Sequence, residues 1–88
     1  MEIYQTTVKD VELEGRQCRM RYSLLAEPAV DRTRYGFAVC NESTGEETVV
    51  PDALLDPRDG KRLLAKLVSG SVTPLTLREV VEDFVAEI

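Results

Sequence analysis

The sequence contains no histidine and no tryptophan, and only two of its 88 residues are cysteines. Without histidine the chain cannot form the Ser-His or Cys-His pairs that activate many nucleophiles, and it lacks the commonest metal ligand. Cys18 and Cys40 are too few for a structural zinc site unless carboxylates complete it. We therefore predict no catalytic residues, no metal site and no bound cofactor. The composition favours a non-enzymatic role, although it does not rule out an enzyme.

Long apolar runs are also missing, since none approaches the ~20 residues that a helix needs to cross a bilayer. The first ten residues, MEIYQTTVKD, combine neither a basic start nor an apolar stretch, so they do not resemble a signal peptide. Together these features predict a cytoplasmic protein without a membrane partner. Free cysteines are expected in that reducing compartment. Whether Cys40 is a reactive thiol is left open.

Positive charge is scarce overall, because the net charge is −5 and the sequence pI is about 4.7. Nucleic-acid binding depends on neutralising phosphates, so this balance argues against a nucleic-acid partner. The charge is unevenly distributed along the chain. Residues 16–35 contain five arginines and only two carboxylates. A local basic patch within an acidic protein is therefore expected.

Alternation of apolar and polar residues predicts four strands, at about 3–13, 17–26, 34–41 and 46–50. The first strand changes phase between Val8 and Val11, which predicts a bulge near Lys9–Asp10. Gly15 and Gly45 fit the turns that follow the first and third strands. Pro51 cannot donate to a strand ladder and is expected to end the fourth strand.

After residue 55 the apolar period changes to that of a helix. Asp56 followed by Pro57 predicts a capped helix over about 57–69. A second helix is predicted over about 76–87, starting at Thr76 with Glu79 as a capping box, while Thr73–Pro74 is the alternative start. Its apolar face would contain Leu77, Val80, Val81, Phe84, Val85 and Ile88. In so small a chain this face is expected to be core rather than a partner-binding helix.

These elements predict a single small α+β domain over residues 1–88. An antiparallel meander of three or four strands is followed by two C-terminal helices on one face of the sheet, in the order ββββαα. If strands two and three pair so that Met20 faces Val39 and Tyr22 faces Phe37, one side becomes uniformly apolar. Leu24 would then face Tyr35. Cys18 and Cys40 would lie on opposite sides, which disfavours a disulfide between them.

The outer side of this hairpin is the candidate interaction surface, and it consists of Arg19, Arg21, Gly36, Ala38 and Cys40. Small residues would form an accessible floor, and guanidinium groups at its edge suit carboxylates or phosphates. Three alternatives remain for it: docking of a protein partner, packing against a second copy, or an ordinary solvated face. Gly36 would mark a bulge or be covered by the ring of Tyr22.

Two stretches carry a resemblance to a known family. YGFAV at residues 35–39, which follows MRYSLL, and LAKLVSGSVTPLTLREVVEDFV at residues 64–85 resemble a family of short uncharacterised bacterial proteins, mostly from anaerobic Gram-positive species. The resemblance implies a small stand-alone α+β protein. It transfers no activity, ligand or catalytic residue, because the family is a domain of unknown function.

The leading functional hypothesis is a non-enzymatic interaction or regulatory module that binds a protein partner through the outer sheet face or a strand edge. The alternative is a small-molecule binding protein or minor enzyme with a pocket between helices and sheet, near Tyr4 and Tyr35. A homodimer through the outer face is a further possibility.

Overall fold

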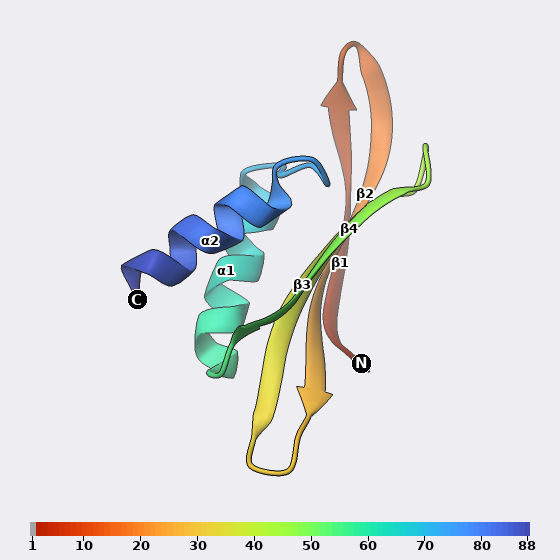
Figure 1. Ribbon diagram of the computed structural model, residues 1–88. Coiled ribbons are helices and arrows are strands. Elements are labelled where there is room, and N and C mark those ends of the chain that lie inside the picture. The colour runs from red at the N-terminus through yellow and green to blue at the C-terminus, as the bar shows by residue number, and fades with distance from the viewer. Residues whose placement is uncertain (1) are drawn as a thin grey trace.

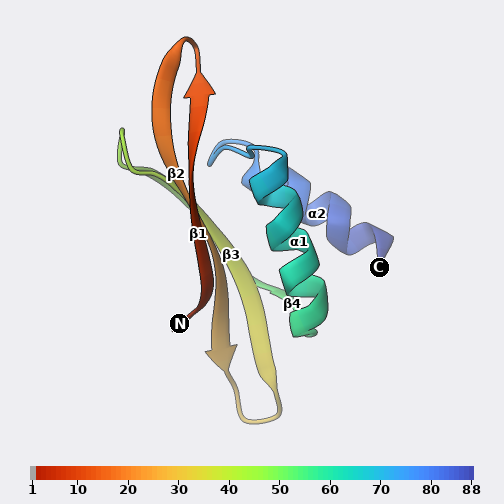
Figure 2. The same cartoon turned by 180° about the vertical axis from the view of Figure 1, so that it is seen from behind.

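The computed structural model describes residues 2–88 and contains one four-stranded antiparallel sheet with two helices on one of its faces (Figures 1 and 2). The strands are adjacent in chain order, and the expected ββββαα arrangement is confirmed. We call the face of the sheet turned away from the helices the outer face. The elements are β1 (Glu2–Leu13), β2 (Arg16–Pro28), β3 (Thr33–Asn41), β4 (Glu46–Leu54), α1 (Pro57–Ser69) and α2 (Leu77–Glu87).

β4 is longer than expected, because it continues through Pro51 to Leu54. The strand order places β4 at an edge of the sheet, where a proline that cannot donate a hydrogen bond is tolerated. The pairing with β3 shifts between Tyr35 and Phe37, and Asp52 takes a left-handed backbone conformation there. The expectation that Pro51 ends the strand is therefore wrong, because the strand bends around it.

The bulge in β1 also differs in position from the expected one. Pairing with β2 is continuous from Gln5 to Leu13, and the irregularity lies between Ile3 and Gln5. Lys9 consequently points to the helix side, where its ammonium donates hydrogen bonds to the carbonyl of Val68 at 2.8 Å and to Ser71 Oγ at 3.0 Å. The apolar pattern placed the bulge wrongly because it excluded a lysine from this side of the sheet.

The register of β2 and β3 is shifted by two residues from the expected one. Met20 lies opposite Asn41, Tyr22 opposite Val39, and Leu24 opposite Phe37. A two-residue shift leaves every side chain on its expected face, so apolar patterning cannot distinguish the two registers. The loop between β2 and β3 fixes the register. Pro28 pairs with Thr33, so only residues 29–32 form the turn between the two strands.

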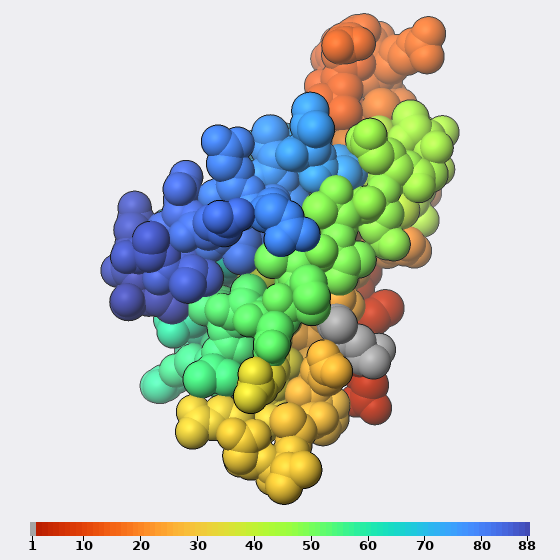
Figure 3. Space-filling view, viewed as in Figure 1, coloured from red at the N-terminus to blue at the C-terminus, as the bar shows by residue number. Residues whose placement is uncertain are grey.

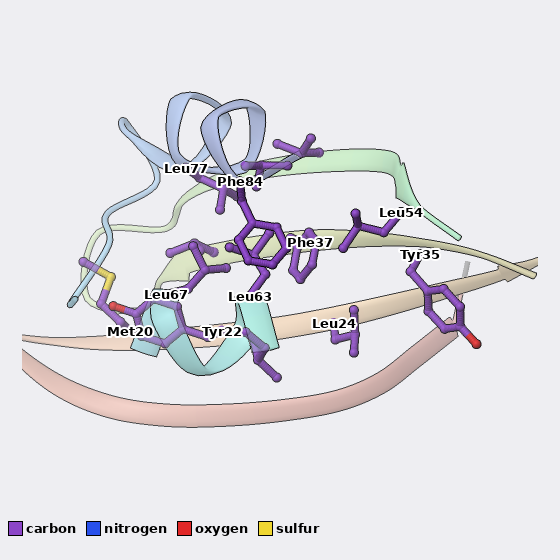
Figure 4. Close-up of a cluster of buried hydrophobic side chains, with 14 of the residues drawn as sticks. Met20, Tyr22, Leu24, Tyr35, Phe37, Leu54, Leu63, Leu67, Leu77 and Phe84 are labelled. Atoms are coloured by element: carbon purple, nitrogen blue, oxygen red, sulfur yellow. The ribbon is translucent and has the colours of Figure 1, made fainter. Parts of the chain in front are cut away.

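The core lies between the sheet and the two helices (Figure 4). In this view Leu63 of α1 and Phe84 of α2 converge on Phe37 of β3. Burial of such side chains contributes roughly 1.5–3 kcal/mol each. The buried apolar cluster consists of Val11, Cys18, Met20, Tyr22, Leu24, Tyr35, Phe37, Val39, Val50, Leu54, Leu63, Leu64, Leu67, Leu77, Val81 and Phe84.

Only part of the apolar face of α2 belongs to this core. Leu77, Val81 and Phe84 are buried, whereas Val85 is 37% exposed and Ile88 is 60% exposed. The reason is the direction of α2, whose C-terminal end lies away from the sheet in both ribbon views (Figures 1 and 2). The expectation that the whole face is core is thus right for Leu77, Val81 and Phe84 and wrong for Val85 and Ile88.

The helix starts follow local capping chemistry to different degrees. The Asp56 carboxylate accepts from the backbone N–H of Arg58 at 2.8 Å, and Pro57 occupies the first turn, as expected. α2 begins after Thr76, but this residue makes no side-chain capping bond, so the capping box does not form. Within residues 2–88, neither helix combines the length and apolar character needed to cross a bilayer.

Candidate interaction surface

The five predicted surface residues lie together on the outer face. Arg21 pairs with Cys40 across β2 and β3, and the next position on this face pairs Ser23 with Ala38. Residues directly opposite in an antiparallel ladder share a face, so the register brings the set together. No helix or strand of the described residues covers this face in either ribbon view (Figures 1 and 2).

Both arginines already have an acidic partner in the chain. Arg19 Nε lies 3.7 Å from Glu42 Oε1, and Arg21 Nη1 lies 3.4 Å from Glu42 Oε2. The β3–β4 turn positions Glu42, because its N–H donates to the carbonyl of Arg19 at 2.8 Å. Exposed pairs of this kind contribute about 0–1 kcal/mol. The surface is therefore less basic than the sequence indicates, and an acidic partner would compete with Glu42.

Gly36 has a structural explanation. A Cβ at this position would lie 2.6 Å from the carbonyl oxygen of Val50 and 2.9 Å from Cα of Pro51. Contacts below 3 Å require the backbone to move, so glycine is needed where β4 bends against β3. Of the two alternatives, the bulge is therefore right. Tyr22 cannot cover Gly36, because its ring is buried in the core on the opposite side of the sheet.

The middle of the outer face consists of small side chains with little exposed surface. Ser23 and Ala38 are only 5% and 8% exposed. Thr6 Oγ1 lies 3.0 Å from Ser23 Oγ, and Val49 lies opposite Ala38 in β4. Three apolar side chains of the outer face are exposed, namely Ile3, Val8 and Val49. They were not identified from the sequence, because the bulge in β1 was misplaced and the two faces of the fourth strand were not assigned.

The two cysteines are both free thiols, and they lie on opposite sides of the sheet. Cys18 is buried in the core beside Val11, whereas Cys40 is partly buried on the outer face opposite Arg21. This geometry separates them, as the alternation pattern predicts.

The region near Tyr4 and Tyr35 is occupied by side chains. The two rings meet edge to face with centroids 5.7 Å apart, and Lys61 Nζ lies 5.6 Å from the centroid of Tyr4. A hollow of about 310 Å³ lies between β1 and α1, and neither tyrosine lines it. These contacts weigh against a ligand pocket at that point.

Tyr22 is the one buried side chain of the described residues whose polar atom has no hydrogen-bond partner. Burial raises the pKa of its phenol. The hydroxyl is enclosed by the core rather than directed into an open cleft, so it offers no ligand contact. Among residues 2–88, no three potential carboxylate or thiolate ligands lie together as a metal site.

The comparisons with known proteins give one match. A model of a family of unknown function, DUF6514, matches residues 1–87. Neither the curated proteins nor the solved structures contain a match to the chain. The family carries no described activity, and the expected bacterial origin stays a prediction. Because the family model covers nearly all of the chain, the protein belongs to this family of unknown function, DUF6514.

Proposed function

We propose that the protein is a non-enzymatic interaction module that binds a protein partner through the outer face of its sheet. The observation that carries this proposal is an uncovered sheet face with exposed Ile3, Val8 and Val49 around the low floor of Ser23 and Ala38. Exposed apolar groups gathered on one face are typical of interaction sites. A flat face of this kind fits another protein surface better than a small ligand, which prefers a concave site.

The polar end of the face adds specificity to this surface. Arg19 and Arg21 share Glu42, and all three side chains are at least one-third exposed. A partner carboxylate that replaces Glu42 would bind two guanidinium groups at once. The cytoplasmic location predicted from the sequence remains a prediction.

Site-specific photocrosslinking in living cells tests the proposal. A photoreactive phenylalanine analogue at Val8 or Val49 should give a discrete crosslinked product, because both side chains are exposed on the outer face. The control position is Arg78, an exposed residue of α2 on the helix side. Products at twice the chain mass would identify a homodimer. Absence of products from both outer positions, or equal products from Arg78, would contradict the proposal.

A charge-reversal variant gives a second test. Arg19→Glu combined with Arg21→Glu should weaken the crosslinked complex while leaving the fold intact, because both side chains are exposed. The free edge of β1 is the remaining route for a partner, by strand addition. In that case the double variant would leave the crosslinks unchanged.

A further inference from the structure

The C-terminal half of α2 stands between two open grooves. One groove, of about 490 Å³, separates it from the segment that joins β4 to α1 and is lined by Leu55, Val85 and Ile88. The other, of about 390 Å³, separates it from β4 and is lined by Pro51, Ala53 and Val85. Val85 lines both, so it forms the ridge between them. Figure 3 shows this end of α2, in dark blue, projecting beside the green β4–α1 region.

The exposed apolar residues here are not required by the core. Leu55, Val85 and Ile88 are 52%, 37% and 60% exposed, whereas Leu77, Val81 and Phe84 of α2 are buried. Three such side chains around adjoining grooves exceed the scattered apolar exposure of an ordinary surface. The grooves offer places into which the apolar side chains of a partner can insert.

The negative charge at this end of α2 favours a positively charged partner. Glu82 lines the groove beside β4, Glu87 lies in the last turn, and this turn contains no basic residue. The C-terminal end of a helix carries a partial negative charge, so the interaction of a nearby carboxylate with the helix dipole is unfavourable. The six ion pairs among the described residues include neither Glu82 nor Glu87. A cationic group of a partner would relieve this repulsion.

Lys66 of α1 lines a hollow together with Glu87, but the cations of α1 do not line the groove that contains Glu82. Arg62 and Lys66 lie over the ring of Phe84, at 5.7 Å and 5.3 Å from its centroid. They therefore occupy the flank of α2 that faces α1, whereas Glu82 lines the groove toward β4. Arg34, at the edge of the other groove, already pairs with Asp52 at 3.2 Å.

The backbone of β4 indicates which kind of segment fits. Pro51 has no N–H, and Asp52 adopts φ of 60°, so the edge is interrupted beside the grooves. A partner strand could not form a regular ladder there. A helix needs no free edge, because it inserts side chains at i, i+3, i+4 and i+7 into a groove.

We propose that these two grooves form a docking site for a basic amphipathic helix of another protein. Its apolar side chains fill the grooves on both sides of Val85, and its lysines or arginines contact Glu82 and the C-terminal end of α2. This site lies on the helix side of the molecule and is independent of the outer face.

A chemical-shift titration of the ¹⁵N-labelled full chain tests the site. The probe is a synthetic peptide of about 14 residues with leucines at helical spacing and lysines elsewhere. We expect shifts confined to residues 52–55 and 81–88. The matched peptide with glutamate in place of lysine should bind more weakly, and added salt should weaken only the lysine peptide.

Variants locate the contacts. Val85→Asp should weaken binding by about tenfold or more, and Val85→Ser gives a milder second case if the first variant is less stable. Glu82→Lys should weaken binding by about threefold, whereas Glu79→Lys, the same charge change on the first turn of α2, should not.

Three results of the experiments with peptide would overturn the proposal. They are the absence of shifts at millimolar peptide, binding that Val85→Asp leaves unchanged, and shifts confined to the strands of the outer face. The last result would favour the function proposed above instead. Shifts of residues 81–88 that depend on protein concentration without peptide would identify a second copy as the occupant, which also overturns a separate basic helix.

Discussion

Replacing Phe84 by alanine measures how far α2 belongs to the core. Phe84 is 6% exposed and contacts the cluster that includes Phe37 and Leu63. Loss of a buried phenylalanine combines the transfer free energy of its ring with the cost of the cavity left behind, which together amount to about 3–5 kcal/mol. A domain of this size has a total free energy of unfolding of roughly 5–13 kcal/mol. The variant should therefore lose a large part of its stability.

The matched control is Val85→Ala, one position further along the same helix. Val85 is 37% exposed, so its truncation should lower the free energy of unfolding by about 1 kcal/mol or less. Urea unfolding, followed by circular dichroism and by fluorescence, measures the free energy of unfolding of both variants. The fluorescence signal comes from tyrosine, because the chain has no tryptophan. The midpoint for Phe84→Ala should fall far more than that for Val85→Ala.

Two results would refute this reasoning. If Phe84→Ala costs less than about 1 kcal/mol, α2 is not part of the core. If both variants cost the same, the distinction between the buried side chains of α2 and its exposed apolar side chains is wrong. If a variant has a lower slope of unfolding free energy against urea, it exposes less surface on unfolding. Thermal unfolding of the full chain would then replace the urea midpoints in comparing the two variants.

Three further predictions concern single interactions. Lys9→Met should lower the free energy of unfolding by about 1.5–3 kcal/mol, because the ammonium bonds the Val68 carbonyl at the end of α1; an unchanged urea midpoint would contradict this. Gly36→Ala should cost about 1–3 kcal/mol, since its Cβ would lie 2.6 Å from the Val50 carbonyl oxygen; broadened or lost amide signals of β4 would support the clash, and an unperturbed spectrum would not. Tyr22→Phe should raise stability by about 1 kcal/mol, because it removes a buried hydroxyl that lacks a partner. Burial raises the pKa of this phenol, so the stability of the natural protein should fall as the pH rises above the ordinary pKa of tyrosine, and thermal melts of the phenylalanine variant should show a smaller fall.

The candidate surface was only partly predictable. The alternation in β2 and β3 correctly groups Arg19, Arg21, Ala38 and Cys40 on one face, because a strand alternates its side chains whatever its partners are. Glu42 could not be identified as the partner of both arginines, since that contact depends on how the β3–β4 turn brings its side chain over β2. The proposed interaction surface therefore depends more on its exposed apolar side chains than on its arginines, which Glu42 already pairs.

The grooves beside α2 were not predictable from the pattern of the helix. Its apolar residues share one face, and this face is the same whether the helix lies flat on the sheet or tilts away from it. Tilt depends on packing against β4 and α1, which are distant in the sequence. For this reason Val81 is buried in the core while Val85 and Ile88 are exposed, although all three side chains are aliphatic.

What the sequence by itself determined is local. It determined the order of strands and helices, the bounds of α1 from its Asp56–Pro57 start, and the faces of β2 and β3. These follow from residues near in the chain, through side-chain period and capping. Only the tertiary structure decided the two-residue register, the position of the β1 bulge and the tilt of α2, because alternatives that keep the same faces differ only in contacts between distant segments.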